Sequence, residues 1–449
     1  MKVLKITLKQ HTPLIHFQHD QYGATLRASE VKPKLDKYII KNVYHNDFNS
    51  CKCFLKSYEK QNEGILLEDF NKQKASLNYK IDITPFNHIE SIRLRQTGPD
   101  NNNNFSTETF PMLLSNMGGQ EDPNKLINFS FYEYIIVTFI FYQNELSSII
   151  ENNISTFFAN TNFGQRSSKG FGSFTVTKIN NKAIKWEENQ YYPQDCPLLQ
   201  FKISKNETLK RQKEIFGTID FYWKCLKSGI NYTRNNRFPY RYIKSYLFNY
   251  LNNKEVNKRT WEKQKIKVNF NLSNNNNHSI NPNPAIFARG LLGCPEKYLY
   301  SNNREIRIVH NEIDLEKIID RIPSPIYFKP VCFNNEVVIY LLFNNEVINS
   351  LKNRQNRKFS FSYNGRSFNL EIEIFLNENN YIEFLNGYHD YLSTNKDVLS
   401  ALYFEHKKTE YQDCNSDELE ADSLAFVPRD FNWKNILTTD QESVTFYNL

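Results

Sequence analysis

The sequence predicts an α+β protein of more than one domain, and three observations lead to this prediction. The chain has 449 residues, which is more than one ordinary hydrophobic core accommodates. Up to about residue 180, its predicted elements are close to the βαββαβ order of the ferredoxin-like fold, with a long insertion. The rest of the chain mixes strands with helices again. We therefore place a first domain at residues 1–180, a second α+β domain with a basic helical insertion at 181–410, and an acidic segment at 411–449.

The first two elements are a strand and a helix. Polar and apolar residues alternate over 2–9, which is the period of a half-buried strand. Apolar residues recur at helical spacing over 31–39; Ser29 is predicted as the N-cap, and Pro33 is tolerated only near a first turn. A helix that begins here directs free N–H groups, together with Lys32 and Lys34, at whatever precedes it, which suits a phosphate. The alternative is a capped surface helix.

Two strands, a loop and a helix complete the part before the glycine-rich segment. Alternation predicts a strand at 77–83, and a dense aromatic and β-branched run predicts a buried strand at 129–142. Residues 98–128 are rich in Asn, Gly and Pro and are interpreted as a long loop. Residues 144–158 have the periodicity of a helix.

The glycine-rich segment at 163–174 is the feature around which we expect the chain to be organised. It holds three of the 14 glycines in the chain, Gly164, Gly170 and Gly172, with Arg166 and Lys169 among them. Glycine permits positive φ and close approach of the backbone to a phosphate. The segment matches neither the dinucleotide-binding nor the Walker pattern, and it leads into a predicted strand that ends near residue 179. An RNA- or phosphate-binding loop and a bulged hairpin turn with ordinary surface charges both remain open.

The second half contains a basic region rich in aromatic residues. Residues 202–267 contain 17 Lys and Arg against five Asp and Glu, and helices are predicted at 206–228 and 237–266. Cations that meet phosphates and aromatic rings that stack on bases are the requirements of a single-stranded RNA surface. The alternative is a pair of amphipathic helices with solvated charges. Strands are predicted at 304–309, 325–333, 336–343, 358–363 and 368–376, and short helices at 312–319 and 394–405.

Histidines and cysteines do not form a metal-binding pattern. His11, His16 and His19 precede Asp20, but their spacing does not fix a zinc site, and the seven cysteines are scattered. We therefore expect neither a metal nor a cofactor. An odd number of cysteines without a signal peptide, and no apolar run long enough to span a membrane, predict a cytoplasmic protein that does not bind membranes.

Three stretches together resemble the RAMP superfamily of CRISPR-associated proteins. They are Thr12-Pro13-Leu14 after the first strand, the segment from Leu26 to Leu35, and the glycine-rich segment from Gly164 to Ser173. The segment from Arg321 to Pro330 is similar to one in the end-capping Cmr subunit one of type III-B complexes. Two features depart from the family pattern: Pro33 replaces a glycine, and His16-Phe17-Gln18-His19 replaces a loop of small residues.

The resemblance implies two ferredoxin-like (RRM-like) domains and a non-catalytic, RNA-binding subunit of a type III-B CRISPR effector. The implied partners are crRNA near its 3′ end, target RNA, the backbone subunits and the large polymerase-like subunit. The RNA-binding residues that we predict lie in the two matching segments and beside the first strand: His19, Arg27, Ser29, Lys32, Lys34, Gly164, Arg166, Lys169, Gly170 and Gly172.

Two other functions are compatible with the sequence. A RAMP endoribonuclease that processes crRNA or cuts target RNA needs an acid–base pair, for which His11, His16, His19 and Asp20 are the early candidates. Clustered histidines also hydrogen-bond to RNA and stack on its bases without a fixed mutual geometry, so we favour binding over chemistry. The third candidate is a protein–protein scaffold.

Overall fold

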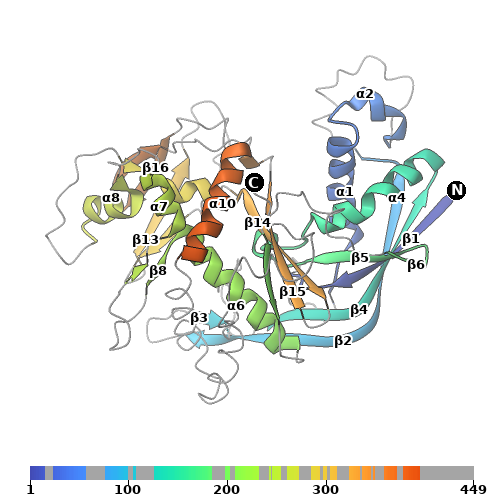
Figure 1. The fold of residues 1–449 in the computed structure, drawn as a ribbon, viewed down its shortest axis with the longest axis horizontal. Coiled ribbons are helices and arrows are strands. Elements are labelled where there is room, and N and C mark those ends of the chain that lie inside the picture. Colours follow the sequence, from blue (N-terminus) through green and yellow to red (C-terminus); the bar gives the residue numbers. More distant parts are fainter. Residues whose placement is uncertain are drawn as a thin grey trace. The chain divides into compact units, whose positions relative to one another are not determined.

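The computed structural model of the chain comprises two compact units (Figure 1). The first unit is Met1–Gly217 with Phe328–Tyr340, and the second is Thr218–Tyr327 with Leu341–Leu449. The predicted domain limits at residues 180 and 410 stay predictions. The structure describes residues 1–15, 24–56, 76–99, 105–107, 126–184, 198–202, 208–231, 242–243, 245–253, 260–272, 285–293, 297–300, 304–310, 323–333, 336–344, 347–348, 358–371 and 378–394.

The first unit is built on a sheet with the strand order of a ferredoxin-like fold. Its main strands are β1 (Lys2–Gln10), β2 (Tyr79–Pro99), β4 (Leu126–Phe141) and β5 (Phe174–Ile179), with the short β3 (Phe105–Thr107) and β6 (Lys182–Ala183) at the edges. The order across the sheet is β3-β2-β4-β1-β5-β6. All neighbouring strands are antiparallel, and the two central strands are the first and third of the four main ones. The predicted α+β class and the ferredoxin-like order of this part are confirmed.

Two helices cover one face of this sheet. α1 (Ala28–Asn42) and α4 (Asn144–Ala159) lie on the same side of the strands in Figure 1. Leu4, Ile6 and Leu8 alternate along β1 and are fully buried in the core that the helices cover. This alternation is the reason the first strand was readable from the sequence. Two further short helical turns, α2 (Phe48–Cys51) and η1 (Lys52–Phe54), follow α1.

The start of α1 differs from the prediction. Arg27, not Ser29, is the N-cap residue, and its carbonyl accepts hydrogen bonds from the N–H groups of Glu30 and Val31, both at 3.0 Å. No side chain caps this end of the helix, and Ser29 lies exposed within the first turn. Pro33 lies beyond the first turn, where it removes one backbone hydrogen bond. Because the Arg27 carbonyl already accepts the first helical hydrogen bonds, Ser29 lies inside the helix and is not its N-cap.

The second strand is longer than predicted, and the predicted loop contains strands. The strand predicted at 77–83 is β2, which continues to Pro99, and β3 and the first residues of β4 lie within the range 98–128 that was interpreted as a loop. Pairing with β4 extends β2 through a stretch with little alternation, from Phe86 to Arg95. A strand held by its neighbour leaves a weak signal in its own sequence.

The first unit also includes residues from far along the chain. β15 (Glu336–Phe343) pairs antiparallel with β7 (Leu198–Lys202), and β14 (Ile326–Phe333) lies on the other side of β15. The strands predicted at 325–333 and 336–343 are confirmed. The helix predicted at 206–228 is α6 (Thr208–Lys227), and its residues up to Gly217 belong to the first unit.

The second unit has its own sheet and helices. The strand order is β10-β11-β17-β16-β13-β12, and the last four strands of this order pair antiparallel. Its described elements are β8 (Ile230–Asn231), β9 (Tyr242–Ile243), α7 (Tyr246–Asn253), β10 (Thr260–Trp261), α8 (Glu262–Asn269), β11 (Ala285–Ile286), η4 (Ala288–Leu292), β12 (Lys297–Tyr300), β13 (Arg304–His310), β16 (Lys358–Tyr363), β17 (Arg366–Glu371) and α10 (Glu378–Thr394).

Two predictions for the second unit need correction. The single basic helix predicted at 237–266 is wrong. The short strand β9 precedes α7 in this range, and the short strand β10 lies between α7 and α8. α10 was not predicted from the sequence, although its residues Phe384, Leu385 and Tyr388 recur at helical spacing and are buried. The helix predicted at 312–319 lies outside the described residues, as does the one predicted at 394–405 apart from its first residue, where α10 ends. Among the described helices, none is long and apolar enough to cross a membrane.

Candidate nucleic-acid interface

The glycine-rich segment is clamped to the residues that follow the first strand. The Gly172 N–H donates to the Pro13 carbonyl at 2.8 Å, and the Gln165 N–H donates to the Ile15 carbonyl at 2.9 Å. Within the segment, the Phe163 N–H donates to the Gly172 carbonyl at 2.9 Å. These bonds close a loop that contains one turn of 3₁₀ helix, η3 (Ser167–Lys169). Two of the three stretches that carry the family resemblance, Thr12–Leu14 and Gly164–Ser173, are therefore joined directly by hydrogen bonds.

The glycines are required by backbone conformation and by close contacts. Gly164, Gly170 and Gly172 have φ of 76°, 91° and 67°. A Cβ at Gly172 would lie 1.9 Å from the Phe163 carbonyl oxygen, and one at Gly164 would lie 2.6 Å from the Ile15 carbonyl oxygen. Arg166 adopts the same left-handed region, with φ of 54°. The glycines thus let the loop approach its own backbone, while the side chains of Arg166 and Lys169 are partly exposed.

The start of α1 lies against this loop. The Lys34 ammonium donates to the Asn162 carbonyl at 2.9 Å, lies 3.6 Å from the Glu30 carboxylate, and is 4.8 Å from the centre of the Phe163 ring. The Glu30 carboxylate in turn accepts a hydrogen bond from the Gly164 N–H. Burial lowers the pKa of Lys34, and the nearby Glu30 carboxylate opposes this shift. The second and third matching stretches are therefore in direct contact.

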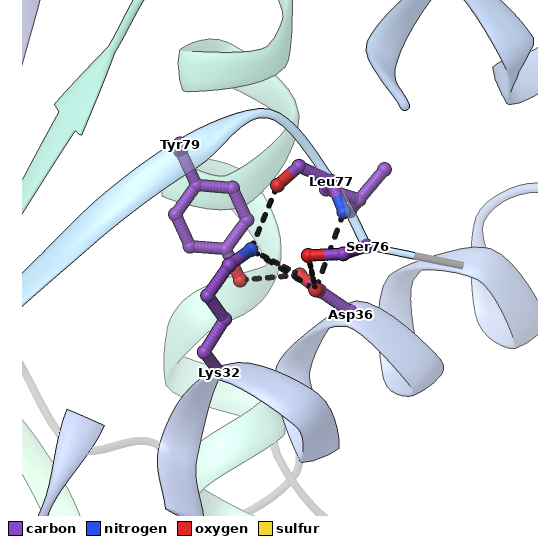
Figure 2. Close-up of polar contacts among 5 residues, drawn as sticks. All are labelled: Lys32, Asp36, Ser76, Leu77 and Tyr79. Atoms are coloured by element: carbon purple, nitrogen blue, oxygen red, sulfur yellow. Dashed lines mark hydrogen bonds and ion pairs between the residues drawn. The ribbon is translucent and has the colours of Figure 1, made fainter. Parts of the chain in front are cut away.

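Lys32 is held by a separate polar cluster, shown in Figure 2. Its ammonium donates to the Asp36 carboxylate at 3.0 Å and to the Leu77 carbonyl at 2.7 Å, and it lies 3.8 Å from the centre of the Tyr79 ring. Asp36 is buried and also accepts hydrogen bonds from the Tyr79 hydroxyl at 2.7 Å and from the Ser76 hydroxyl at 3.2 Å. Burial raises the pKa of Asp36 and lowers the pKa of Lys32. This cluster fixes α1 to the beginning of β2.

A buried lysine from the second half of the chain supports the glycine-rich loop. Lys329 on β14 has no exposed surface, and its ammonium donates to the carbonyls of Phe158, Thr161 and Phe174 at 2.8, 2.9 and 3.0 Å. These carbonyls lie at the end of α4, just before the loop, and at the start of β5. Burial lowers the pKa of Lys329 well below its usual value. One side chain thereby joins both ends of the loop.

Two more hydrogen bonds attach the loop to the same strand. The Asn162 amide donates to the carbonyls of Ser167 and Phe328, both at 2.7 Å, and the Ser173 hydroxyl donates to the Pro330 carbonyl at 2.6 Å. In the sequence, the stretch from Arg321 to Pro330 is notable only for its family resemblance. A lysine in an otherwise apolar strand was the one signal that could have indicated this supporting role.

His11 is part of the structural support. It is 3% exposed; its Nδ1 accepts a hydrogen bond from the Cys332 N–H at 3.1 Å, and its Nε2 lies 2.7 Å from the Thr175 hydroxyl. An acceptor at Nδ1 places the proton on Nε2, so the imidazole is neutral. Burial, reinforced by Lys9, Lys329 and Arg211, lowers the pKa of His11 well below its usual value. A buried neutral imidazole with both nitrogens engaged is not arranged for acid–base work on RNA.

The predicted site residues are thus brought together in part. Lys34 donates to the Asn162 carbonyl beside the loop, and Gly164 donates to Glu30 of the same helix. Arg27 and Ser29 lie at the start of that helix, and Arg166, Lys169, Gly170 and Gly172 lie within the loop. Lys32 lies on the same helix, but its ammonium is directed into the Asp36 cluster (Figure 2). His16, His19 and Asp20 lie outside the described residues. Within the part of the chain that the structure describes, no group of three His, Cys, Asp or Glu side chains could hold a metal ion.

Comparison with known protein families gives two matches along this chain. Residues 1–230 match the Cmr1 N-terminal domain, and residues 242–409 match the Cmr1 C-terminal domain. The chain belongs to the Cmr1 family. The resemblance to Cmr subunit one that the sequence motifs indicated is confirmed by these matches. No curated protein matches the sequence of this Cmr1 family member.

Solved structures with similarity to this Cmr1 family member are distant in sequence. The crystal structure of Cmr1 from Pyrococcus furiosus in its apo form has 9% identity and a TM-score of 0.34, covering 87% of this chain and 97% of that one. A chain of the Type III-B Cmr-beta bound to cognate target RNA and AMPPnP has 10% identity and a TM-score of 0.32, covering 87% of this chain and 99% of that one. A chain of Cmr-beta bound to cognate target RNA has 13% identity and a TM-score of 0.24. That match covers 40% of this chain and 59% of the other, which is less than two thirds of its length.

Proposed function

We propose that this protein is an RNA-binding, non-catalytic subunit of a type III-B Cmr effector complex. In this role it contacts crRNA near its 3′ end and target RNA, beside the backbone subunits and the large polymerase-like subunit. Membership of the Cmr1 family supports the complex. The observation that supports RNA contact is the glycine-rich loop, which carries two partly exposed cations on a fixed backbone next to the start of a helix.

The chemistry of the loop suits a phosphate backbone. Arg166 and Lys169 supply positive charge, and Lys34 and Arg27 lie on the adjoining helix start, where N–H groups favour anions. The hydrogen bonds of the loop to Pro13, Ile15 and Lys329 pre-form this arrangement, so little conformational entropy is lost on binding. In this proposal the glycines and Lys32 hold the loop and α1 in place. The cations Arg27, Lys34, Arg166 and Lys169 contact the phosphates of the RNA.

The alternative of an endoribonuclease gains no support from the described residues. One of its candidates, His11, is a buried neutral imidazole that hydrogen-bonds to β14 and β5. RNA cleavage needs an acid–base pair or metal ligands that converge on one phosphate. We therefore place the function in binding.

A charge-removal variant tests the proposal. We expect the variant Arg166→Ala with Lys169→Ala to bind single-stranded RNA at least about tenfold more weakly at moderate salt. Each cation that contacts a phosphate releases a counterion from the RNA, and this favourable release is lost with the side chain. The slope of log affinity against log salt concentration should become shallower by about 1.4 units in the same variant, about 0.7 for each lost contact with a single strand. Fluorescence anisotropy with a labelled RNA at several salt concentrations measures both quantities.

The matched control is Lys52→Ala with Lys182→Ala, which removes two exposed lysines outside the loop. It should leave the affinity and the slope close to those of the parent protein. Thermal unfolding should be similar for all three proteins, since loop charges contribute little stability. Equal affinity in parent and loop variant, or a parent protein that shows no salt-dependent RNA binding, contradicts the proposal.

A further inference from the structure

The face of the first unit's sheet opposite α1 and α4 carries a second group of features that suit RNA. Along β1 and β2, the side chains that alternate with the core residues are exposed or half-buried. On β2, Tyr79, Ile81 and Ile83 pack in or against the core, so the intervening residues from Lys80 to Phe86 occupy the other face. We call this face the open face. It consists of Val3, Lys5, Thr7, Lys80, Asp82, Thr84, Phe86, Tyr134, Ile136, Thr138, Ile140 and Lys178.

Two aromatic rings form a stack on the open face. Phe86 on β2 and Tyr134 on the central strand β4 are directly paired, and their rings are 5.3 Å apart and inclined by 14°. Phe86 is 37% exposed, whereas Phe139 and Phe141 on the paired strand β4 are fully buried. A nucleobase that lies on the outer side of Phe86 would extend this stack by one ring. Aromatic side chains on a four-stranded sheet are the means by which RRM domains bind single-stranded RNA.

The charge of the open face complements a phosphate backbone. Lys5, Lys80 and Lys178 are exposed and lie on three different strands, and Asp82 is the only carboxylate among the open-face residues. The Asp82 carboxylate accepts a hydrogen bond from the Thr84 hydroxyl at 3.3 Å. From Lys80 to Phe86 the strand extends roughly 20 Å, enough for a short run of nucleotides. Stacking rings, hydroxyls and an excess of lysine occur together here.

We propose that the open face is a binding platform for single-stranded RNA, separate from the glycine-rich loop. One base stacks on Phe86 and Tyr134, and the phosphates of the neighbouring nucleotides meet Lys80, Lys5 and Lys178. This contact recognises unpaired RNA by its bases, whereas the glycine-rich loop acts on phosphates. The platform adds a second contact to the RNA-binding function proposed above and therefore rests on it.

The test separates base stacking from charge. The full-length chain and its Phe86→Leu variant are titrated with a labelled single-stranded RNA, and with the same RNA carrying abasic residues. We expect Phe86→Leu to weaken binding of the intact RNA about five- to tenfold, since one base–aromatic stack contributes about this much. The variant and the parent should bind the abasic RNA equally. Phe86→Tyr, which keeps a ring, should bind intact RNA like the parent.

The controls distinguish the platform from the loop. Ile89→Ala, at an apolar side chain that is 60% exposed on the same strand, should change the affinity less than twofold. The Arg166→Ala/Lys169→Ala variant should keep its defect on abasic RNA, because its contacts are with phosphates. The platform is overturned, and the loop proposal stands, if Phe86→Leu binds intact RNA like the parent while Arg166→Ala/Lys169→Ala binds it more weakly. If the parent binds no RNA, both are overturned, and if Phe86→Leu instead abolishes assembly with other Cmr subunits while RNA affinity is unchanged, the open face is a protein interface.

Discussion

At the scale of single residues, the glycine-rich loop depends on positions that accept no side chain. Gly172 has φ of 67° and lies so close to Phe163 that a Cβ would overlap its carbonyl oxygen. Gly365 has φ of 75°, but a Cβ there would meet no atom within 4 Å. The two glycines therefore separate the cost of a left-handed backbone from the cost of a steric overlap.

The variants Gly172→Ala and Gly365→Ala test this difference. We expect Gly365→Ala to lower the free energy of unfolding by about 1–2 kcal/mol, the ordinary cost of an L-residue in the left-handed region. Gly172→Ala should cost more than about 3 kcal/mol, because the loop backbone must move away from Phe163 as well. Hydrogen exchange of amides in the unit that holds each glycine measures both values. Equal losses of stability at the two positions would show that the loop backbone moves away from the new Cβ of residue 172 at no extra cost.

His11 predicts a dependence of stability on pH. Burial lowers the pKa of its imidazole in the folded state, whereas the unfolded chain has the ordinary value of about 6.5. The unfolded state therefore takes up a proton first as the pH falls, and stability is lost below about pH 6.5, by up to about 1.4 kcal/mol per pH unit from this group. Above that pH the neutral imidazole has no such cost.

Urea unfolding at pH 7.5 and pH 5.5 checks the contribution of His11. We expect the loss of stability between these values to be smaller in His11→Gln than in the parent, whatever the stability of the variant at pH 7.5. His88→Gln, at an exposed histidine, is the control and should retain the loss. The same pH dependence in parent and His11→Gln would rule out a buried neutral imidazole at this position.

At the scale of elements, β14 completes the support of the glycine-rich loop from more than 150 residues away. Lys329, Phe328 and Pro330 on this strand contact Phe174, Asn162 and Ser173, respectively. Two of the three contacts are made by β14 backbone carbonyls, so the strand must be present, while the third needs the lysine itself. The loop is therefore a product of both halves of the chain.

The variant Lys329→Met tests the role of the buried ammonium. It keeps much of the side-chain volume but leaves the carbonyls of Phe158, Thr161 and Phe174 without this donor. We expect the free energy of unfolding to fall by about 2–4 kcal/mol, because an unpaired buried polar group costs about 1–3 kcal/mol. Lys182→Met, at an exposed lysine of β6, should change it by less than about 0.5 kcal/mol.

Loss of the ammonium should also release the loop. Faster hydrogen exchange of the loop amides between Phe163 and Ser173, with little change in α1, would locate the effect of Lys329→Met. An unchanged or higher stability would mean that removing a buried amine compensates for the three carbonyls, contrary to our expectation.

At the scale of the whole molecule, the proposed function is binding without chemistry. We predict that the isolated protein does not cut crRNA precursor or guide-matched target RNA, with or without Mg²⁺, because both ring nitrogens of His11, the described member of the candidate cluster, are engaged inside the protein. Denaturing gels of end-labelled RNA after incubation with purified protein provide the measurement. Specific fragments that disappear in a His16→Ala/His19→Ala/Asp20→Asn variant would establish the endoribonuclease instead.

The sequence by itself determined the elements whose signal is local. Alternation along β1, the aromatic and β-branched run of β4 and the periodicity of α4 each predicted an element that the structure contains. The order of the predicted elements indicated the ferredoxin-like arrangement of the first unit, and the three matching stretches, with the segment from Arg321 to Pro330, indicated the family. These features are readable because side-chain period and glycine content act over a few residues.

Only the tertiary structure decided what depends on distant partners. Contacts with other parts of the chain decide four features: the extension of β2 along β4, the inward direction of Lys32, the neutral state of His11 and the burial of Lys329. The apolar residues around Lys329 indicate a buried strand, but they do not show that the three carbonyls of Phe158, Thr161 and Phe174 accept hydrogen bonds from its ammonium. Local pattern sets which elements form, whereas long-range packing sets the environment, and hence the charge and role, of each polar side chain.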